Sequence, residues 1–145
     1  MAGERVLLVE DNLVNRRMAQ FLLKSRGFVV VEAITGEEAI RLARGERPDL
    51  IIMDLQLAGM DGFTATRAIK ADPVTRHIPI VAMTAYAMSG DRERALEAGC
   101  DGYITKPIDT KEFPLTIARY LAAARSRERG GEAPPGRAPE DDGDG

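Results

Sequence analysis

The sequence predicts an α/β protein in which helices cover both faces of a parallel β-sheet. Short apolar runs alternate along the chain with segments whose apolar residues recur at helical spacing. The runs are continuously apolar, which is typical of strands that are buried on both faces. Because crossovers between parallel strands are right-handed, few topologies remain. We therefore expect five strand–helix units in one doubly wound sheet.

The first two units occupy roughly the first third of the chain. The first strand is expected at Arg5 to Val9, and the helix after it stops near Gly27. The apolar stripe of that helix consists of Val14, Met18, Phe21 and Leu22. A β-branched second strand follows at Phe28 to Val31. Thr35 and Glu38 form a capping-box pattern, which predicts the start of the second helix.

The third and fourth units follow the same alternation. Gly45 and Pro48 end the second helix, and the third strand is expected at Leu50 to Met53. A glycine-containing loop then leads to a weaker helical pattern from about Thr64 to Ala71. A connection flanked by two prolines separates this helix from the fourth strand, Ile80 to Met83.

The fifth unit closes the pattern. Ser89 and Asp91 are expected to open the fourth helix, which Gly99 ends, and the fifth strand lies at about Gly102 to Thr105. The last helix carries its apolar stripe at Phe113, Ile117 and Leu121. Pro114 must lie in the first turn of that helix, because a proline further inside would remove a hydrogen bond and kink it.

Length and composition predict one globular domain with a polar tail. A chain of 145 residues with 44% hydrophobic residues can bury a substantial core. From about Arg125 the apolar pattern fails, and glycine, proline and acidic residues follow. Such a segment has too little apolar surface to offset chain entropy. We expect a domain over residues 1–124 and a disordered polar tail over residues 125–145.

Charge and cysteine content exclude several classes of function. The net charge of −3 and the lack of a Lys/Arg cluster argue against a nucleic-acid-binding surface. Cys100 is the only cysteine, so no intrachain disulfide can form. The first apolar run is too short for a secretory signal, and no stretch is long enough to cross a membrane. We expect a cytoplasmic protein that binds neither nucleic acid nor membrane.

Polar side chains that can handle phosphate or metal follow four of the expected strands. They are Glu10 and Asp11 after the first strand, Asp54 after the third, Thr84 after the fourth and Lys106 after the fifth. The carboxyl ends of parallel strands share one edge of a sheet, where ligands bind. Each residue alone has an ordinary explanation, such as a helix cap or a solvated loop lysine. Their joint placement instead predicts a phosphoryl-transfer site.

The chemistry of these residues is consistent without reference to any relative. The Asp54 carboxylate can attack a phosphoryl group and hold it as an acyl phosphate. Charge repulsion between the two requires a cation, and Mg²⁺ takes oxygen ligands such as Asp11 and Asp54. The Lys106 ammonium and the Thr84 hydroxyl then offer donors to the phosphoryl oxygens.

Four segments resemble the receiver domain of two-component response regulators. They are VLLVEDN (Val6 to Asn12), PDLIIMDLQLAGMDG (Pro48 to Gly62), IPIVAMTA (Ile78 to Ala85) and GCDGYITKPID (Gly99 to Asp109). The resemblance covers roughly Arg5 to Ala124 and implies a flavodoxin-like fold with five parallel strands in the order 2-1-3-4-5. It also implies phosphorylation of Asp54.

The resemblance implies further roles at the same site. Glu10 would hold a metal-bound water, and the backbone carbonyl of Gln56 would be another Mg²⁺ ligand. Tyr103 would turn inward when Thr84 is drawn to the phosphoryl group, although a strand tyrosine is equally often just packed. The chain departs from the family pattern at Ala58, where many receivers have proline, and this change is expected to loosen the loop from Gln56 to Gly62.

The expected function is that of a phosphoacceptor rather than an enzyme. The phosphodonor would be a histidine kinase or a histidine phosphotransfer protein, docking on the first helix near Leu13, Val14 and Arg17. A downstream protein would recognise the surface of the fourth helix, fifth strand and fifth helix. The alternatives are a phosphorylation-independent interaction module of the same fold and an aspartyl-phosphate phosphatase. A flavodoxin-like or dinucleotide-binding protein is disfavoured, because no glycine-rich or hydroxyl-rich loop follows the first strand.

Overall fold

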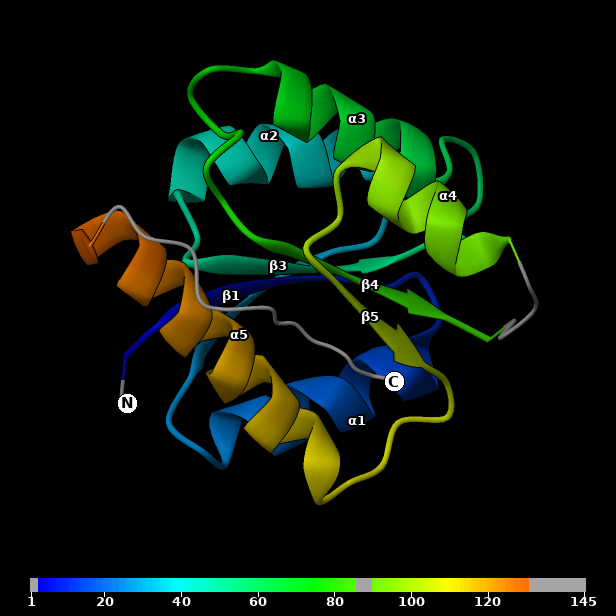
Figure 1. Ribbon diagram of the computed structural model, residues 1–145. Coiled ribbons are helices and arrows are strands. Elements are labelled where there is room, and N and C mark those ends of the chain that lie inside the picture. The colour runs from blue at the N-terminus through cyan, green and yellow to red at the C-terminus, as the bar shows by residue number, and fades with distance from the viewer. Residues whose placement is uncertain (1–2, 86–89, 131–145) are drawn as a thin grey trace.

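The computed structural model describes residues 3–85 and 90–130. In this part of the chain, five parallel strands form one sheet in the order β2-β1-β3-β4-β5, which confirms the predicted topology (Figure 1). The strands are β1 (Arg5–Val9), β2 (Val29–Ala33), β3 (Leu50–Asp54), β4 (Ile80–Thr84) and β5 (Gly102–Thr105). The helices are α1 (Leu13–Lys24), α2 (Gly36–Glu46), α3 (Gly62–Ala71), α4 (Asp91–Ala98) and α5 (Glu112–Gly130).

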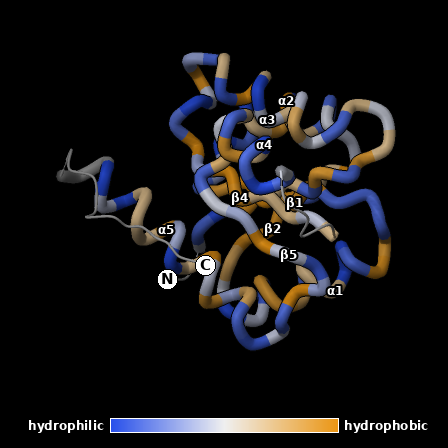
Figure 2. The backbone as a smooth tube through the Cα atoms, turned by 45° about the vertical axis from the view of Figure 1, so that its right-hand side comes forward, coloured by the Kyte–Doolittle hydropathy of each residue, from blue (hydrophilic) through white to orange (hydrophobic). Residues whose placement is uncertain are grey.

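Helices cover both faces of the sheet, with α2, α3 and α4 on one side and α1 and α5 on the other (Figure 1). Alternate residues of the central strands serve the two sides. Leu7, Ile51 and Ala82 pack in one core cluster, whereas Leu8, Ile52 and Val81 pack in the other. Figure 2 shows hydrophobic residues concentrated along these strands. The continuous apolar runs in the sequence therefore do correspond to burial on both faces.

The register of the strands brings their carboxyl ends to one edge. Val9 of β1 is paired with Met53 of β3. Asp54 is paired with Met83 of β4, and Thr84 with Thr105 of β5. Asp54 and Thr84 are thus the last residues of their strands, one position past the apolar runs that predicted them.

Helix starts depend on side-chain caps, and one of these was not predicted. The hydroxyl of Thr35 accepts the N–H of Glu38, as the capping-box pattern required, while the Glu38 carboxylate accepts the N–H of Ile34. Helix α3 begins at Gly62 rather than near Thr64, because Oδ1 of Asp61 caps it by accepting the N–H of Thr64 at 2.8 Å. The fourth helix begins at Asp91 as expected, and Ser89 lies outside the described residues.

Helix α5 is longer than expected. Pro114 lies in its first turn, as predicted, but the helix continues to Gly130, past the expected domain end at Ala124. The expectation of a disordered tail starting at residue 125 is wrong for residues 125–130. An ion pair between Arg125 and the buried carboxylate of Glu4 at the start of β1 stabilises this extension. Residues 131–145 lie outside the described part, so the tail itself stays a prediction.

Candidate phosphoryl-transfer site

The two acidic residues after β1 are held in different environments. Glu10 is buried, and its Oε2 accepts the backbone N–H of Asn12 at 3.1 Å. Asn12, not Asp11, caps helix α1 by accepting the N–H of Asn15. Asp11 is exposed, and its Oδ2 accepts the backbone N–H of Ala58 at 3.1 Å. Because Asn12 performs the capping, the Asp11 carboxylate can face the loop after β3.

Asp54 lies at the centre of the site. Its side chain is buried at the end of β3, and its Oδ1 accepts the backbone N–H of Gln56 at 3.0 Å. Its Oδ2 lies 2.9 Å from Nζ of Lys106, which comes from the segment after β5. The same ammonium lies 3.1 Å from Oε1 of Glu10. One ion-pair network therefore joins Glu10, Asp54 and Lys106, although Glu10 and Lys106 are more than ninety positions apart in the chain.

Glu10, Asp11 and Asp54 can together hold a metal ion. One carboxylate oxygen from each lies within 4.8 Å of the others. Oε1 of Glu10 is buried and makes no hydrogen bond among the described residues, despite its proximity to the ammonium. Its charged neighbour is the Lys106 ammonium, which Asp54 shares, and a buried carboxylate oxygen in this position suits a further cation or a cation-bound water. Because Mg²⁺ prefers oxygen ligands in a site that keeps several waters, the donor set fits this ion.

The site concentrates negative charge. Burial, followed by the hydrogen bond and charge of Asp54, raises the pKa of Glu10 from 4.5 to about 7, although Lys106 opposes the shift. Burial lowers the pKa of the Lys106 ammonium, but its contacts with Asp54 and Glu10 outweigh burial and raise that pKa above its ordinary value. Lys106 thus stays charged, while the carboxylates repel one another until a further cation balances them.

The hydroxyl of Thr84 points toward Gln56, which lies two residues after Asp54. Thr84 is buried at the end of β4, and its Oγ1 donates to the side-chain Oε1 of Gln56 at 3.1 Å. Oε1 of Gln56 also accepts the backbone N–H of Ala85 at 3.2 Å. The side chain of Gln56 therefore joins the ends of β3 and β4. The role of the Gln56 backbone carbonyl as a metal ligand, which the family resemblance implies, stays a prediction.

Tyr103 is partly buried against the core cluster beneath α2, α3 and α4. Burial, and then the charge of Asp91 at the start of α4, raises the pKa of its phenol. The side chain thus packs near the helix that follows β4. Its role in a conformational change stays a prediction.

Ala58 does not leave the loop after β3 untethered. The N–H that binds Asp11 is a backbone group that proline lacks, so the departure from the family pattern supplies a contact to a candidate metal ligand. The expected loosening of the loop from Gln56 to Gly62 stays a prediction.

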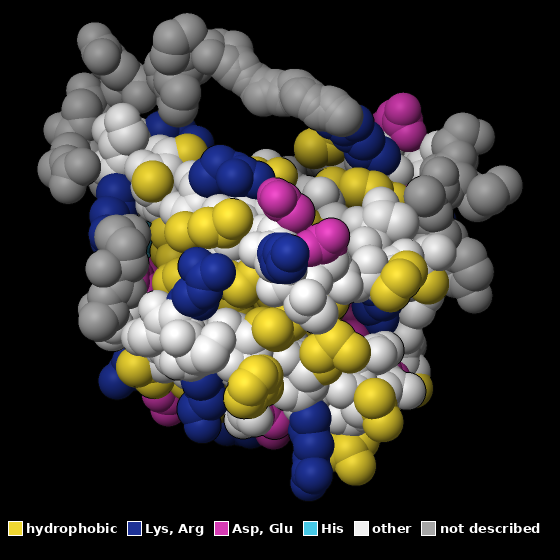
Figure 3. Space-filling view, turned by 90° about the horizontal axis from the view of Figure 1, so that it is seen from below, with side chains coloured by type: hydrophobic (Ala, Val, Ile, Leu, Met, Phe, Trp, Pro, Cys, Tyr) yellow, Lys and Arg dark blue, Asp and Glu magenta, His cyan; other side chains and the backbone are white. Residues whose placement is uncertain are grey.

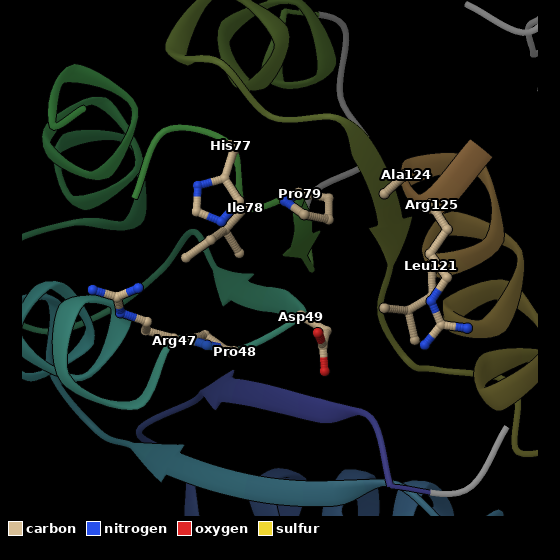
Figure 4. Close-up of a pocket in the computed structure, with 9 residues that line it drawn as sticks. All are labelled: Arg47, Pro48, Asp49, His77, Ile78, Pro79, Leu121, Ala124 and Arg125. Carbon is tan, nitrogen blue, oxygen red and sulfur yellow. The ribbon is translucent and has the colours of Figure 1, made fainter. Parts of the chain in front are cut away.

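A pocket of about 130 Å³ lies at the opposite end of the strands (Figure 4). It is lined by Arg47, Pro48, Asp49, His77, Ile78, Pro79, Leu121, Ala124 and Arg125. His77 is exposed there, in agreement with a loop role. Because these residues precede β3 and β4 or end α5, the pocket is separate from the acidic group.

Among the described residues, no helix is long and apolar enough to cross a membrane.

Comparison with known proteins relates this arrangement to one family. The family model described as the response regulator receiver domain matches residues 6–118. The polar-differentiation response regulator DivK of Brucella anthropi is 44% identical over 119 residues, which cover 82% of this chain and 97% of that protein.

Solved structures of receiver domains are also similar to this chain. The receiver domain of the sensor histidine kinase PA1611 from Pseudomonas aeruginosa, described with a magnesium ion coordinated in the active site cleft, is 41% identical with a TM-score of 0.78. That match covers 83% of this chain and 99% of the other. A CheY-like receiver domain protein from Methanospirillum hungatei is 25% identical with a TM-score of 0.78, covering 87% and 99% of the two chains.

Proposed function

Because this chain belongs to the response regulator receiver family, we propose that it accepts a phosphoryl group on Asp54 from a phosphohistidine in a two-component phosphorelay. The observation that carries the proposal is the single network in which the Lys106 ammonium contacts Asp54 at 2.9 Å and Glu10 at 3.1 Å. A buried carboxylate that faces both a cation and two further acids is suited to a metal-assisted attack on phosphorus.

The proposed reaction forms one bond and breaks one. A carboxylate oxygen of Asp54 attacks phosphorus, and the phosphorus–nitrogen bond of the donor breaks. The electron pair of that bond goes to the ring nitrogen of the leaving imidazole, which takes up a proton from solvent. Mg²⁺, held by Asp11, Asp54 and the carbonyl of Gln56, with Glu10 binding a coordinated water, would neutralise charge on the transferring group. Lys106 stabilises the equatorial oxygens, and its raised pKa keeps it protonated in this role.

The product would act as a signal through a change in conformation. A phosphoryl group adds charge and acceptor oxygens at Asp54, and the Thr84 hydroxyl is a donor on the adjacent strand. Movement of Thr84 would alter the surface of α4, β5 and α5, with Tyr103 packed beneath α4. A downstream protein that distinguishes the two arrangements would read the signal. Turnover is limited to the chain's own aspartyl phosphate.

The first helix offers a docking surface for the phosphodonor. Leu13, Val14, Met18 and Phe21 of α1 are exposed, and the helix contains arginine and lysine but no acidic residue. Figure 3 shows hydrophobic side chains among basic ones on the face of α1 and α5. The N-terminal end of α1 lies beside Asp11, at the same edge as Asp54. A histidine kinase or phosphotransfer protein with an apolar and acidic helical surface would fit here.

The test is phosphorylation by acetyl phosphate and by a phosphorylated histidine phosphotransfer protein, followed by intact mass. Wild type should gain one phosphoryl group with Mg²⁺ and none with EDTA. Asp54→Asn should gain none. Asp109→Asn is the matched control, because asparagine caps a helix as well as aspartate does and this residue caps α5 at the same edge.

Other outcomes would identify the alternatives. Labelling that persists in Asp54→Asn would contradict the proposal. A partner that binds equally well with and without modification of Asp54 would indicate a phosphorylation-independent interaction module. Multiple turnover of added phosphate esters would indicate a phosphatase.

A further inference from the structure

The side chain of Gln56 contacts both strand ends that the proposed reaction uses. Its Oε1 accepts the hydroxyl of Thr84 at 3.1 Å and the N–H of Ala85 at 3.2 Å. Its backbone N–H donates to Oδ1 of Asp54 at 3.0 Å. The orientation of the amide follows from Ala85, because a backbone N–H can only donate and must meet an oxygen. One residue thus links the phosphoacceptor to the end of β4.

The contact between Gln56 and Thr84 competes with the contact that a phosphoryl group would make. A threonine hydroxyl carries one hydrogen, so it donates to one strong acceptor at a time. A phosphoryl group on Asp54 would bring charged oxygens that accept more strongly than a neutral amide. For Thr84 to donate to the phosphoryl group, its hydroxyl would have to leave Oε1 of Gln56.

We propose that Gln56 is a positioning residue whose side chain holds Thr84 and Ala85 in the arrangement of the unphosphorylated protein. The inference rests on the proposed phosphorylation of Asp54. Each neutral hydrogen bond makes a modest net contribution, so the side chain biases the equilibrium and does not block it. Loss of both bonds should shift the equilibrium toward the phosphorylated arrangement by about tenfold. Binding of a phosphoryl group or its mimic should then become tighter by the same factor.

Gln56→Met tests this, because methionine has nearly the same length but lacks a strong acceptor, and it leaves the backbone carbonyl in place. The measurement is the affinity for beryllofluoride, a phosphoryl mimic, in the presence of Mg²⁺, followed by the amide resonances of β4 and β5. The variant should bind about tenfold tighter than wild type. Merely structural damage would weaken binding, so the direction of the change separates the two explanations.

A double-mutant cycle with Thr84→Val checks that Gln56 acts through the threonine. In the Thr84→Val background, Gln56→Met should have a clearly smaller effect, with only the Ala85 bond left to lose. Equal or weaker beryllofluoride binding by Gln56→Met would overturn the inference, as would an undiminished effect without Thr84. If wild type neither binds beryllofluoride nor is labelled by acetyl phosphate, the proposed function fails as well.

Discussion

The stability of the metal-free protein should fall as the pH rises, because Glu10 must ionise in a buried position beside Asp54. Its pKa is raised from 4.5 to about 7, chiefly by burial. A carboxyl group with a raised pKa in the folded state contributes stability that is fully present below pH 4.5 and is lost as the pH rises through about 7. The difference corresponds to about 3 kcal/mol. This is an upper bound, because ions and water near the exposed Asp11 screen part of the repulsion.

Glu10→Gln isolates this contribution, because glutamine cannot ionise but its oxygen can still accept the N–H of Asn12. Urea unfolding in EDTA is measured for both proteins from about pH 5 to about pH 8. The stability of the variant relative to wild type should increase by about 2 kcal/mol over this range. Taking the difference cancels groups common to both proteins. Glu97→Gln, at an exposed position on α4, should follow wild type at every pH.

Adding Mg²⁺ to the same unfolding experiment should have the opposite effect to raising the pH in EDTA. At about pH 8, added Mg²⁺ should stabilise wild type more than Glu10→Gln, because an ion that binds only the folded state adds its binding free energy to stability. Stability curves of Glu10→Gln and wild type that stay parallel across the pH range in EDTA would refute the reasoning about the buried Glu10 carboxyl. Equal stabilisation of both by Mg²⁺ would refute a role for Glu10 near the metal.

Three further substitutions test how the site and the sheet are held. Gly62→Ala would place a Cβ 2.4 Å from the backbone oxygen of the phosphoacceptor, so it should cost about 2 kcal/mol in urea unfolding and slow labelling by acetyl phosphate. Gly45→Ala, with nothing within 4 Å, should instead stabilise by up to about 1 kcal/mol, and a loss of similar size in both would count against the steric argument. Lys70→Met removes an ammonium that donates to two backbone carbonyls and a carboxylate, and should lower the free energy of unfolding by about 2 kcal/mol. Unchanged stability would show that water replaces those bonds. Arg125→Met strands the buried carboxylate of Glu4 and should cost about 1 kcal/mol, since the arginine is partly exposed. Adding Glu4→Gln should recover most of that loss, and failure to recover it would mean that packing, not charge, holds the end of α5.

The strands were predictable because a strand buried on both faces leaves a direct trace in composition. The short apolar runs at Leu50 to Met53 and Ile80 to Met83 indicated strands buried on both faces, and both are fully buried strands. The residues after them were predictable as a group for the same reason, since the topology dictates that these ends meet. The roles proposed for Asp54 and Lys106 followed from their chemistry, whereas those of Glu10 and the Gln56 carbonyl depended on the family resemblance.

Contacts made by loops were not predictable, because they depend on tertiary distances between segments far apart in the chain. Asp61 could have been a turn residue or a cap, and only the position of α3 decides between them. The hydrogen bond between Gln56 and Thr84 joins residues 28 positions apart, and no local pattern encodes it. Arg125 looked like the start of a polar tail because its partner, Glu4, lies at the other end of the chain.

Helix α5 determines where a label or a surface can be attached without blocking the reaction. Its 19 residues begin beside the segment that carries Lys106 and span about 28 Å. Arg125 meets Glu4 at the amino ends of the strands, so α5 ends on the side away from Asp54. A fluorophore or a biosensor chip coupled at that end would leave the acidic edge and the start of α1 open to incoming kinases.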